Sequence, residues 1–227
     1  KKADPATITS LILTASGGAF RDYPISKLDT VTWQDALAHP TWDMGTKITI
    51  DSASMANKGL EVIEACELFD IPEDKVQVVI HPQSCVHGMI ATLDGSFYAQ
   101  LSRPDMRIPI QNALSYPEML DYPEEKLTFD NMTLDFKKPD FERYPCLTLA
   151  REAAGKGGPY CLAYNAANEV AVEAFITERI RFTQIPRVIS SCLDGDWGNL
   201  LGSLEQILDL DQQVRTRATS MIQEMAK

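Results

Sequence analysis

The stretch DSASMANKGLE, residues 51–61, combines side-chain types that bind a phosphate group and a metal ion. Asn57, Lys58 and Glu61 would share one face of a predicted helix near its start, because residues three and four apart lie side by side on a helix. Ser52 and Ser54 add hydroxyl groups just before them. The free N–H groups at a helix start attract anions, and a carboxylate suits a divalent cation. The stretch therefore predicts a phosphate site, with Glu61 as a metal ligand one turn further on.

A purely structural interpretation of the same residues stays open. Serine near a helix start is often only an N-cap, and a lysine and a glutamate at helical spacing often form a solvated ion pair. The site interpretation requires that the side chains of Ser52, Asn57 and Lys58 face one common cavity. Spacing along the chain does not decide this.

Further positions could also contribute to a ligand site. A Ser-Gly-Gly turn at residues 16–18 follows a predicted buried strand, where it either binds an anion through backbone N–H groups or is a plain turn. His39 and Trp42 lie in a long irregular segment of the kind that often forms a lid, although a solvated histidine and ordinary packing of the tryptophan stay open. His81 and His87 flank another strand end. They could be ligands, but a structural role is favoured because the sequence identifies no partner.

The elements that position these residues predict an α+β fold, with a mixed α/β catalytic domain followed by a helical bundle. Apolar runs predict strands at residues 8–14, 47–50, 76–80, 86–93 and 96–101, the last two joined by an Asp-Gly turn. Helical periodicity predicts helices at residues 32–38, 54–69, 147–154, 162–178, 185–193 and 211–225. The second of these would face the core with Met55, Gly59, Val62, Ile63, Cys66 and Phe69.

Composition changes along the chain predict its domain organisation. We expect a catalytic domain with a β-sheet at residues 1–115. Within it, the segment from about residue 17 to residue 45 would form a long flexible flap. A linker rich in proline and charged residues follows at residues 116–143. The C-terminal residues 144–227 are expected to form a four-helix bundle, because strand signals end there.

The charge and the cysteines limit the possible partners and location. The formal net charge of −11 argues against a nucleic acid or an anionic membrane as partner, because both bind clustered basic surfaces. The 5 cysteines are scattered without a CxxC pair, which suits reduced thiols in a cytoplasmic protein. No apolar run approaches the length of a membrane span. The chain begins with Lys1 rather than Met, which suggests a fragment of a longer protein.

Taken together and in order, the motifs resemble successive blocks of the 1-deoxy-D-xylulose 5-phosphate reductoisomerase family. The blocks that carry the resemblance are LTASGGAFR, HPTWDMG, DSASMANKGLE, IHPQSCVHGMI, LSRPDMRIPIQNAL, RYPCL and NAANEVAVEAF. The family isomerises 1-deoxy-D-xylulose 5-phosphate and reduces it to 2-C-methyl-D-erythritol 4-phosphate, in the non-mevalonate route to isoprenoids. The resemblance implies NADPH, a divalent metal (Mn, Mg or Co), a sugar phosphate substrate and a homodimer.

The resemblance also implies roles for individual residues. The expected substrate-binding residues are Ser16, His39, Ser52, Asn57, Lys58 and Glu61. His39 and Glu61 would act in catalysis, and Glu61 would be one of three metal carboxylates. Trp42 and Met44 would belong to the closing flap. Gly45 would lie near NADPH, while Pro104 and Met106 would border the active site.

Two parts of the family pattern are missing from this sequence. It has no glycine-rich strand-to-helix turn for a nicotinamide cofactor, and no Asp-Ser-Glu motif upstream of the turn at residues 16–18. We therefore expect the C-terminal portion of the enzyme, able to bind phosphate but inactive by itself. The alternative is a non-catalytic module for phosphate binding or for dimerisation through the hairpin at Asp94 and Gly95.

Overall fold

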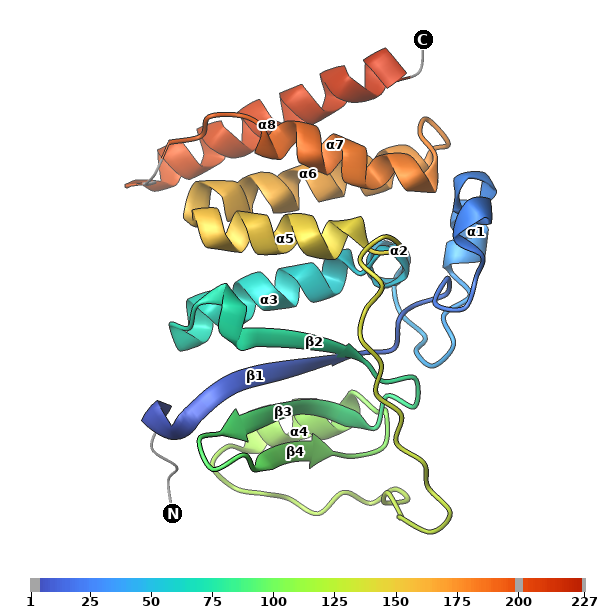
Figure 1. The fold of residues 1–227 in the computed structure, drawn as a ribbon, viewed down its shortest axis with the longest axis vertical. Helices are drawn as coiled ribbons and strands as arrows, with labels where there is room; N and C mark the ends of the chain where they lie inside the picture. Colours follow the sequence, from blue (N-terminus) through green and yellow to red (C-terminus); the bar gives the residue numbers. More distant parts are fainter. Residues whose placement is uncertain (1–4, 199–201, 226–227) are drawn as a thin grey trace.

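The computed structural model describes residues 5–198 and 202–225 and contains a mixed sheet with helices stacked above it (Figure 1). The sheet order is β2-β1-β3-β4. Its strands are β1 (Ile8–Ala15), β2 (Val76–Ile80), β3 (Val86–Thr92) and β4 (Phe97–Leu101). The structure confirms the predicted mixed α/β fold with C-terminal helices. Every predicted strand but one is present with nearly the predicted bounds.

The connection from β1 to β2 brings two strand ends together. β1 pairs in parallel with β2, and Ala15 lies opposite Ile80 at the carboxyl ends of both strands. On its other side β1 pairs antiparallel with β3. The long crossover that parallel pairing requires contains η2 (Ile25–Thr30), α1 (Trp33–Ala36), α2 (Thr46–Ser54) and α3 (Ala56–Phe69). The capping box predicted for the first of these helices is present, between Thr32 and Asp35.

The predicted strand at residues 47–50 is wrong, because these residues belong to the helix α2. Their alternating pattern is too short to distinguish strand from helix. Ile50 and Ala53, which are one helical turn apart, are buried together in the core formed with the C-terminal helices. This tertiary packing overrides the strand preference of the β-branched residues.

Helix α3 begins at Ala56 rather than at residue 54, because the backbone of Met55 is left-handed with φ of 59°. Met55 and Val62 are buried as predicted. Phe69 does not face the core. It is the last residue of the helix and is 63% exposed.

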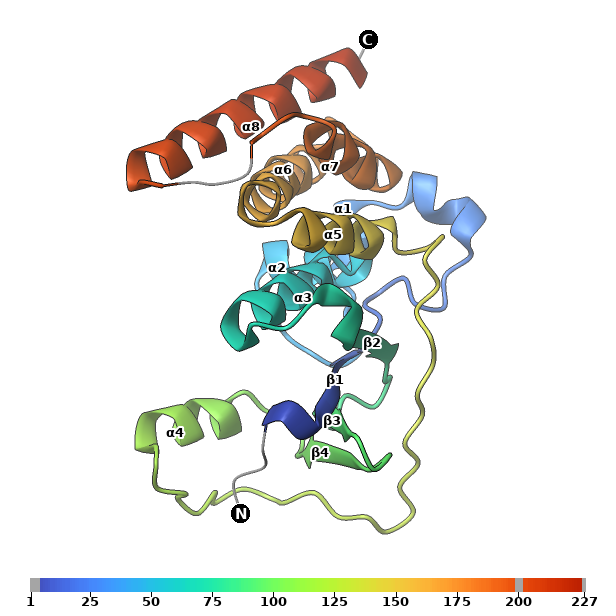
Figure 2. The same cartoon turned by 60° about the vertical axis from the view of Figure 1, so that its left-hand side comes forward.

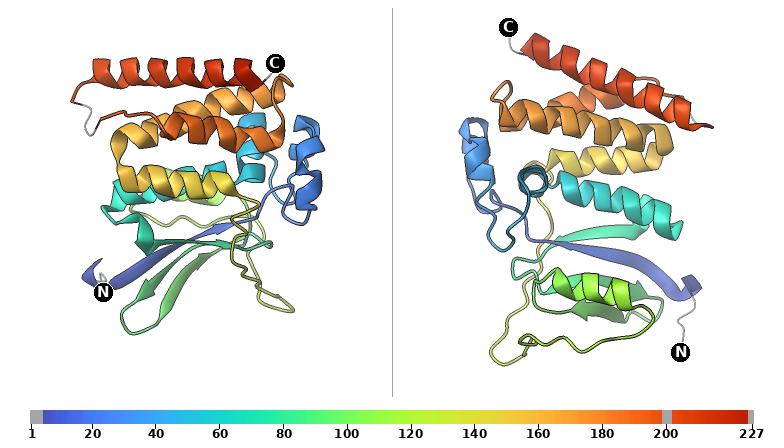
Figure 3. Two further views of the ribbon diagram at one scale, coloured as in Figure 1. Left: turned by 45° about the horizontal axis from the view of Figure 1, so that its top comes forward. Right: turned by 180° about the vertical axis from the view of Figure 1, so that it is seen from behind.

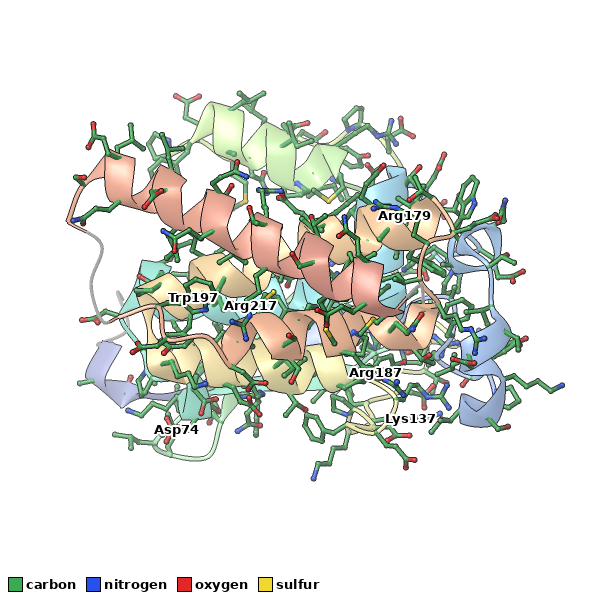
Figure 4. All side chains as sticks on the ribbon, turned by 90° about the horizontal axis from the view of Figure 1, so that it is seen from above. Asp74, Lys137, Arg179, Arg187, Trp197 and Arg217 are labelled. Carbon is green, nitrogen blue, oxygen red and sulfur yellow. The ribbon has the colours of Figure 1, made fainter. Side chains whose placement is uncertain are left out.

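The C-terminal helices form layers above α3, as the two views of Figure 3 show. They are α5 (Pro145–Lys156), α6 (Gly158–Ile176), α7 (Ile185–Leu193, preceded by η4, Phe182–Gln184) and α8 (Leu204–Met225). Figure 4 shows Trp197 and Arg217 above α7. Both side chains donate hydrogen bonds of 2.8 Å to carbonyls in its last turn, those of Cys192 and Ser191 respectively. They thereby satisfy carbonyl groups that have no partner within the helix.

The segment after β4 contains one helix that the sequence analysis missed, α4 (Arg107–Ser115). From there the chain runs as an extended segment along the sheet and up to α5 (Figure 2). Lys137 of this segment pairs with Ile80 at the edge of β2 through hydrogen bonds of 2.8 and 2.9 Å. The remaining 3₁₀ turns are η1 (Pro5–Thr7) and η3 (Glu73–Lys75). None of the helices in the described ranges has the length and apolar character needed to cross a membrane.

Candidate active site

A cavity of about 500 Å³ lies at the carboxyl ends of β1 and β2, between the sheet and the junction of α2 with α3. Strand ends of this kind are common ligand sites in α/β folds. Most of the predicted site residues line it: Ser16, His39, Trp42, Met44, Ser52, Asn57, Lys58, Glu61 and Met106. Ser54, Gly45 and Pro104 are not part of its lining.

The junction of α2 and α3 explains why Ser52, Asn57 and Lys58 share the cavity. Ser52 lies in the last turn of α2, and the other two lie in the first turn of α3. The left-handed Met55 turns the chain between the helices, so that both helix ends face the same space. Ser54 instead turns inward, where its hydroxyl donates to the carbonyl of Asp51 over 3.2 Å. The first turn of α3 presents N–H groups that have no partner within the helix.

Lys58 places a positive charge in the wall of the cavity. Its residue surface is only 7% exposed, and its Nζ lies 2.6 Å from Oε2 of Glu61. The ion pair that the structural interpretation expected is therefore present, but its lysine is buried rather than solvated. A buried ammonium group interacts more strongly with an anion than an exposed one, because less water screens it.

Ser16 and His39, which both line the cavity, form a hydrogen bond with 2.8 Å between Oγ and Nε2. The backbone N–H groups of Thr41 and Trp42 donate to Nδ1 of His39 over 3.1 and 2.8 Å. Nδ1 is therefore an acceptor, so a neutral His39 carries its proton on Nε2 and donates to Ser16. Ser16 also accepts from the N–H of Gly18 over 3.1 Å. With two donors on its oxygen, the Ser16 hydroxyl keeps its own hydrogen for a ligand.

The loop that carries Ser16 is held in place from two sides. Gly18 packs so closely on α2 that a Cβ atom there would lie 2.4 Å from the carbonyl oxygen of Ser52. On the other side, the hydroxyl of Tyr144 donates to the carbonyl of Gly17 over 2.9 Å. Residues that are distant in sequence thus fix the relative positions of Ser16 and Ser52.

The predicted flap residues lie over the cavity to different extents. Trp42 and Met44 are partly buried and line it, while Gly45 is the exposed N-cap residue of α2. Burial and the nearby Arg21 charge lower the pKa of His39, which favours the neutral ring that binds the Thr41 and Trp42 amides. His39 therefore links Thr41 and Trp42 of the flap to Ser16.

His81 and His87 both line the cavity, and each has a hydrogen-bond partner in the protein. His81 is fully buried, with Nδ1 2.9 Å from the Asp135 carbonyl and Nε2 accepting from the Cys85 N–H over 3.3 Å. Nε2 of His87 lies 2.7 Å from the hydroxyl oxygen of Ser102. These contacts are those expected of structural histidines.

Several lining residues were not identified from the sequence: Thr14, Asp43, Ser84 and Val86. All four fall within the motif blocks quoted above, but neither their types nor their spacing indicated a role. Thr14 is occupied, because its hydroxyl donates to the Val86 carbonyl over 2.6 Å. Ser84 differs, since its buried Oγ has no hydrogen-bond partner.

The residues that the structure describes do not by themselves fit a metal centre or a nicotinamide site. Among them there is no group of three or more His, Cys, Asp or Glu side chains placed to hold a metal ion. Glu61 is the predicted metal ligand, and it is paired with Lys58. The turn after β1 leads into an irregular segment rather than directly into a helix, so it is not a dinucleotide-binding turn.

Comparison with known protein families tests the resemblance directly. The profile of the DXP reductoisomerase C-terminal domain matches residues 101–217, and that of the 1-deoxy-D-xylulose 5-phosphate reductoisomerase C-terminal domain matches residues 1–69. The chain belongs to the 1-deoxy-D-xylulose 5-phosphate reductoisomerase family. The predicted family membership is confirmed.

Curated reductoisomerases resemble the chain over nearly all of its length. The 1-deoxy-D-xylulose 5-phosphate reductoisomerase of Trichlorobacter lovleyi is 53% identical over 212 residues, which cover 93% of this chain and 54% of that protein. The reductoisomerase of Chloroherpeton thalassium is 50% identical over 93% of this chain and 55% of its own length. The chain thus spans about half the length of these relatives.

Solved reductoisomerase structures share the fold. A crystal structure of DOX-P reductoisomerase in complex with NADPH, fosmidomycin and magnesium has a TM-score of 0.91 and 46% identity, covering 97% of this chain and 57% of that one. The reductoisomerase of Zymomonas mobilis in complex with NADPH has a TM-score of 0.90 and 41% identity, covering 98% and 57%. These values support the same fold over nearly all of this chain.

Proposed function

We propose that this chain forms the phosphate pocket and the closing flap of a 1-deoxy-D-xylulose 5-phosphate reductoisomerase. The enzyme would be an NADP-dependent oxidoreductase that converts 1-deoxy-D-xylulose 5-phosphate to 2-C-methyl-D-erythritol 4-phosphate in isoprenoid biosynthesis. The observation that carries the proposal is the buried ammonium group of Lys58 in the wall of a cavity that Ser16, Ser52 and Asn57 also line.

The phosphate of the substrate would bind between the two helix ends and the loop after β1. Lys58 would neutralise its charge, while Ser16, Ser52 and Asn57 would donate hydrogen bonds to its oxygens. The N–H groups in the first turn of α3 would add further donors. Binding energy gained at this end of the substrate would orient the reacting carbons, which lie away from the phosphate.

The flap residues would act once the phosphate is bound. Trp42 and Met44 would cover the sugar and exclude water, with Met106 bordering the same space. His39 would bind the substrate and hold the flap to Ser16 at the same time. Gly45, which lies outside the lining, would contact NADPH rather than the sugar phosphate. Pro104 would border the active site.

Glu61 would be one ligand of the divalent metal (Mn, Mg or Co) that the family uses. A single carboxylate binds such an ion weakly, because each oxygen ligand adds attraction and fixes geometry. Most of the NADPH site and the further metal ligands would have to come from outside the residues of this chain. We therefore propose that these 227 residues bind the sugar phosphate but do not turn it over.

Calorimetric titration of the chain with 1-deoxy-D-xylulose 5-phosphate and with inorganic phosphate tests the proposal. Replacing Lys58 with methionine should weaken binding of both ligands by about 10- to 100-fold, the value of a hydrogen bond to a charged group. The matched control is Lys156→Met, since Lys156 is exposed on α5 and lies outside the cavity. Equal affinity of the wild type and Lys58→Met would contradict the proposal.

We also propose that the chain forms a homodimer through the edge strand β4. Phe97 and Tyr98 are 66% and 60% exposed on this strand, and Leu93 in the adjoining turn is 72% exposed. An exposed apolar edge strand can pair with another strand. Sedimentation at micromolar concentration tests this, and a monomer there would contradict it.

A cytoplasmic location remains a prediction from the scattered cysteines.

A further inference from the structure

Ser84 has a buried hydroxyl group without a partner in the wall of the proposed substrate cavity. The residue is 8% exposed and lines the cavity, while its Oγ atom is shielded from solvent and makes no hydrogen bond. A buried polar atom without a partner is unfavourable, and such atoms are uncommon in folded proteins. The position of this atom therefore requires an explanation.

The turn between β2 and β3 holds Ser84 in an unusual backbone conformation. Its φ of 52° is left-handed, which is uncommon for serine. The Ser84 N–H donates to the His81 carbonyl over 3.1 Å, and the next N–H, that of Cys85, donates to Nε2 of His81 over 3.3 Å. The ring of His81 is fixed in turn, with Nδ1 2.9 Å from the Asp135 carbonyl. The turn is thus held on both sides of Ser84, so backbone movement is not an easy way to pair the hydroxyl.

Rotation about χ1 is the movement that remains for Ser84. Serine occupies three staggered rotamers, and at most a small barrier separates them. The residue borders the cavity, so rotation can carry Oγ from its shielded position toward the cavity. The strand register places the turn beside the ligand-binding loop, because Ala15 opposite Ile80 puts Ser16 and His81 at adjacent strand ends. A ligand oxygen in the cavity would then supply the partner that the hydroxyl lacks.

We propose that the Ser84 hydroxyl rotates into the cavity on binding and forms a hydrogen bond with an oxygen atom of the sugar phosphate. This inference rests on the proposed function of the site. Strained backbone and unpaired polar groups collect at ligand sites, where the ligand completes the hydrogen bonding. The contact oxygen belongs either to the phosphate or to the sugar, and comparison of two ligands distinguishes them.

The substitution Ser84→Ala tests the proposal because it changes stability and affinity in different directions. Removing an unpaired hydroxyl should leave the melting temperature unchanged or higher. The affinity for 1-deoxy-D-xylulose 5-phosphate should fall by roughly 3- to 30-fold, as for loss of one hydrogen bond. The matched control is Ser10→Ala, since Ser10 is also 8% exposed but lies near the start of β1 and accepts from Gln77 Nε2 over 3.4 Å. Ser10→Ala should lose a little stability and keep its affinity for 1-deoxy-D-xylulose 5-phosphate.

Titration with inorganic phosphate then locates the contact. If Ser84→Ala weakens both ligands, the contact is to the phosphate; if it weakens only the sugar phosphate, the contact is to the sugar. Either result supports the proposal. Because the proposal requires a change of χ1, ligand binding should also change the Hα–Hβ coupling constants of Ser84. Unchanged affinity in Ser84→Ala, alongside weakened binding in Lys58→Met, would overturn the role of Ser84 alone. A wild-type chain that binds neither ligand would overturn both this role and the proposed function.

Discussion

Asn168 on α6 donates a hydrogen bond of 2.9 Å from Nδ2 to Oδ1 of Asp51 on α2. Both residues are fully buried, and the other carboxylate oxygen of Asp51 lies 2.5 Å from Nζ of Lys47. Burial raises the pKa of Asp51, the opposing effects of Lys47 and Asn168 being smaller. Asp51 directly precedes Ser52, so this contact joins the C-terminal helices to the wall of the cavity.

Replacing Asn168 with leucine should therefore destabilise the chain and weaken ligand binding. A buried carboxylate that loses a donor costs about 3 kcal/mol in free energy of unfolding, which urea titration measures. The double variant Asp51→Leu/Asn168→Leu should cost less than the sum of the two single variants, because it leaves no buried carboxylate oxygen without the Asn168 donor. Strictly additive costs would show that the two side chains do not interact.

Replacing Gly18 with alanine should separate the loop of Ser16 from α2. The φ of Gly18 is +67°, and a Cβ there would lie 2.4 Å from the Ser52 carbonyl oxygen. Gly95→Ala is the matched control, because Gly95 has φ of +83° but no neighbour within 4 Å of a Cβ. Both variants incur the backbone cost of alanine at positive φ, about 1 kcal/mol in free energy of unfolding. Gly18→Ala should lose more stability than Gly95→Ala, and it should also bind the sugar phosphate more weakly. Equal melting temperatures and affinities for the two variants would argue against this close contact.

Replacing Tyr144 with phenylalanine should loosen the same loop without changing the cavity lining. The loss of its 2.9 Å hydrogen bond to the Gly17 carbonyl should cost about 1–2 kcal/mol in free energy of unfolding. Burial raises the pKa of Tyr144 to about 12, above the ordinary 10.0. The folded state then holds this proton more tightly, so stability should fall as the pH rises from about 10 to 12. The phenylalanine variant should lack that part of the pH dependence; an identical dependence would contradict the assignment.

Protonation of His39 should release the flap. The pKa of His39 is lowered below its ordinary 6.5 by burial and by Arg21, so its contribution is present above about pH 6.5 and is lost as the pH falls through the lowered value. Protonated Nδ1 cannot accept the Thr41 and Trp42 N–H groups. Hydrogen exchange should therefore show lower protection factors for these two amides at acidic pH.

His39→Asn is the control for this titration. Asparagine keeps an acceptor near the position of Nδ1 but does not titrate, so protection of the Thr41 and Trp42 amides should no longer depend on pH in this way. The variant also removes the donor to Ser16, so sugar phosphate affinity should fall by roughly tenfold. The same pH dependence in both proteins would exclude His39 as the titrating group.

The 227-residue chain should show no oxidation of NADPH when mixed with 1-deoxy-D-xylulose 5-phosphate and manganese. The described residues hold no group of three metal-binding side chains, and Glu61 is paired with Lys58. Full-length reductoisomerase from Trichlorobacter lovleyi serves as the positive control for the absorbance assay. If the wild-type chain oxidises NADPH and the Lys58→Met variant does not, the expected inactivity is disproved.

The sequence predicted the elements whose local pattern has one interpretation. The strand at residues 8–14 is a continuous apolar run, the Asp-Gly turn joins β3 to β4, and the helix at residues 185–193 has the predicted bounds. Ordered motifs also predicted the family and most of the residues that line the cavity. The strand, turn and helix depend on neighbours within a few residues, so local chemistry determines them. The lining residues were predicted mainly through the family resemblance instead.

Tertiary structure decided the features that depend on distant residues. Residues 47–50 became a helix because Ile50 and Ala53 pack into the core of the C-terminal helices. The helix also separates Ser52, which lines the cavity, from Ser54, which turns inward, since residues two apart point to different sides of a helix but to the same side of a strand. The Tyr144 bond to Gly17 and the Asn168 bond to Asp51 join residues more than 100 positions apart. Local periodicity cannot encode such contacts, since they form only when the packed core brings separate elements together.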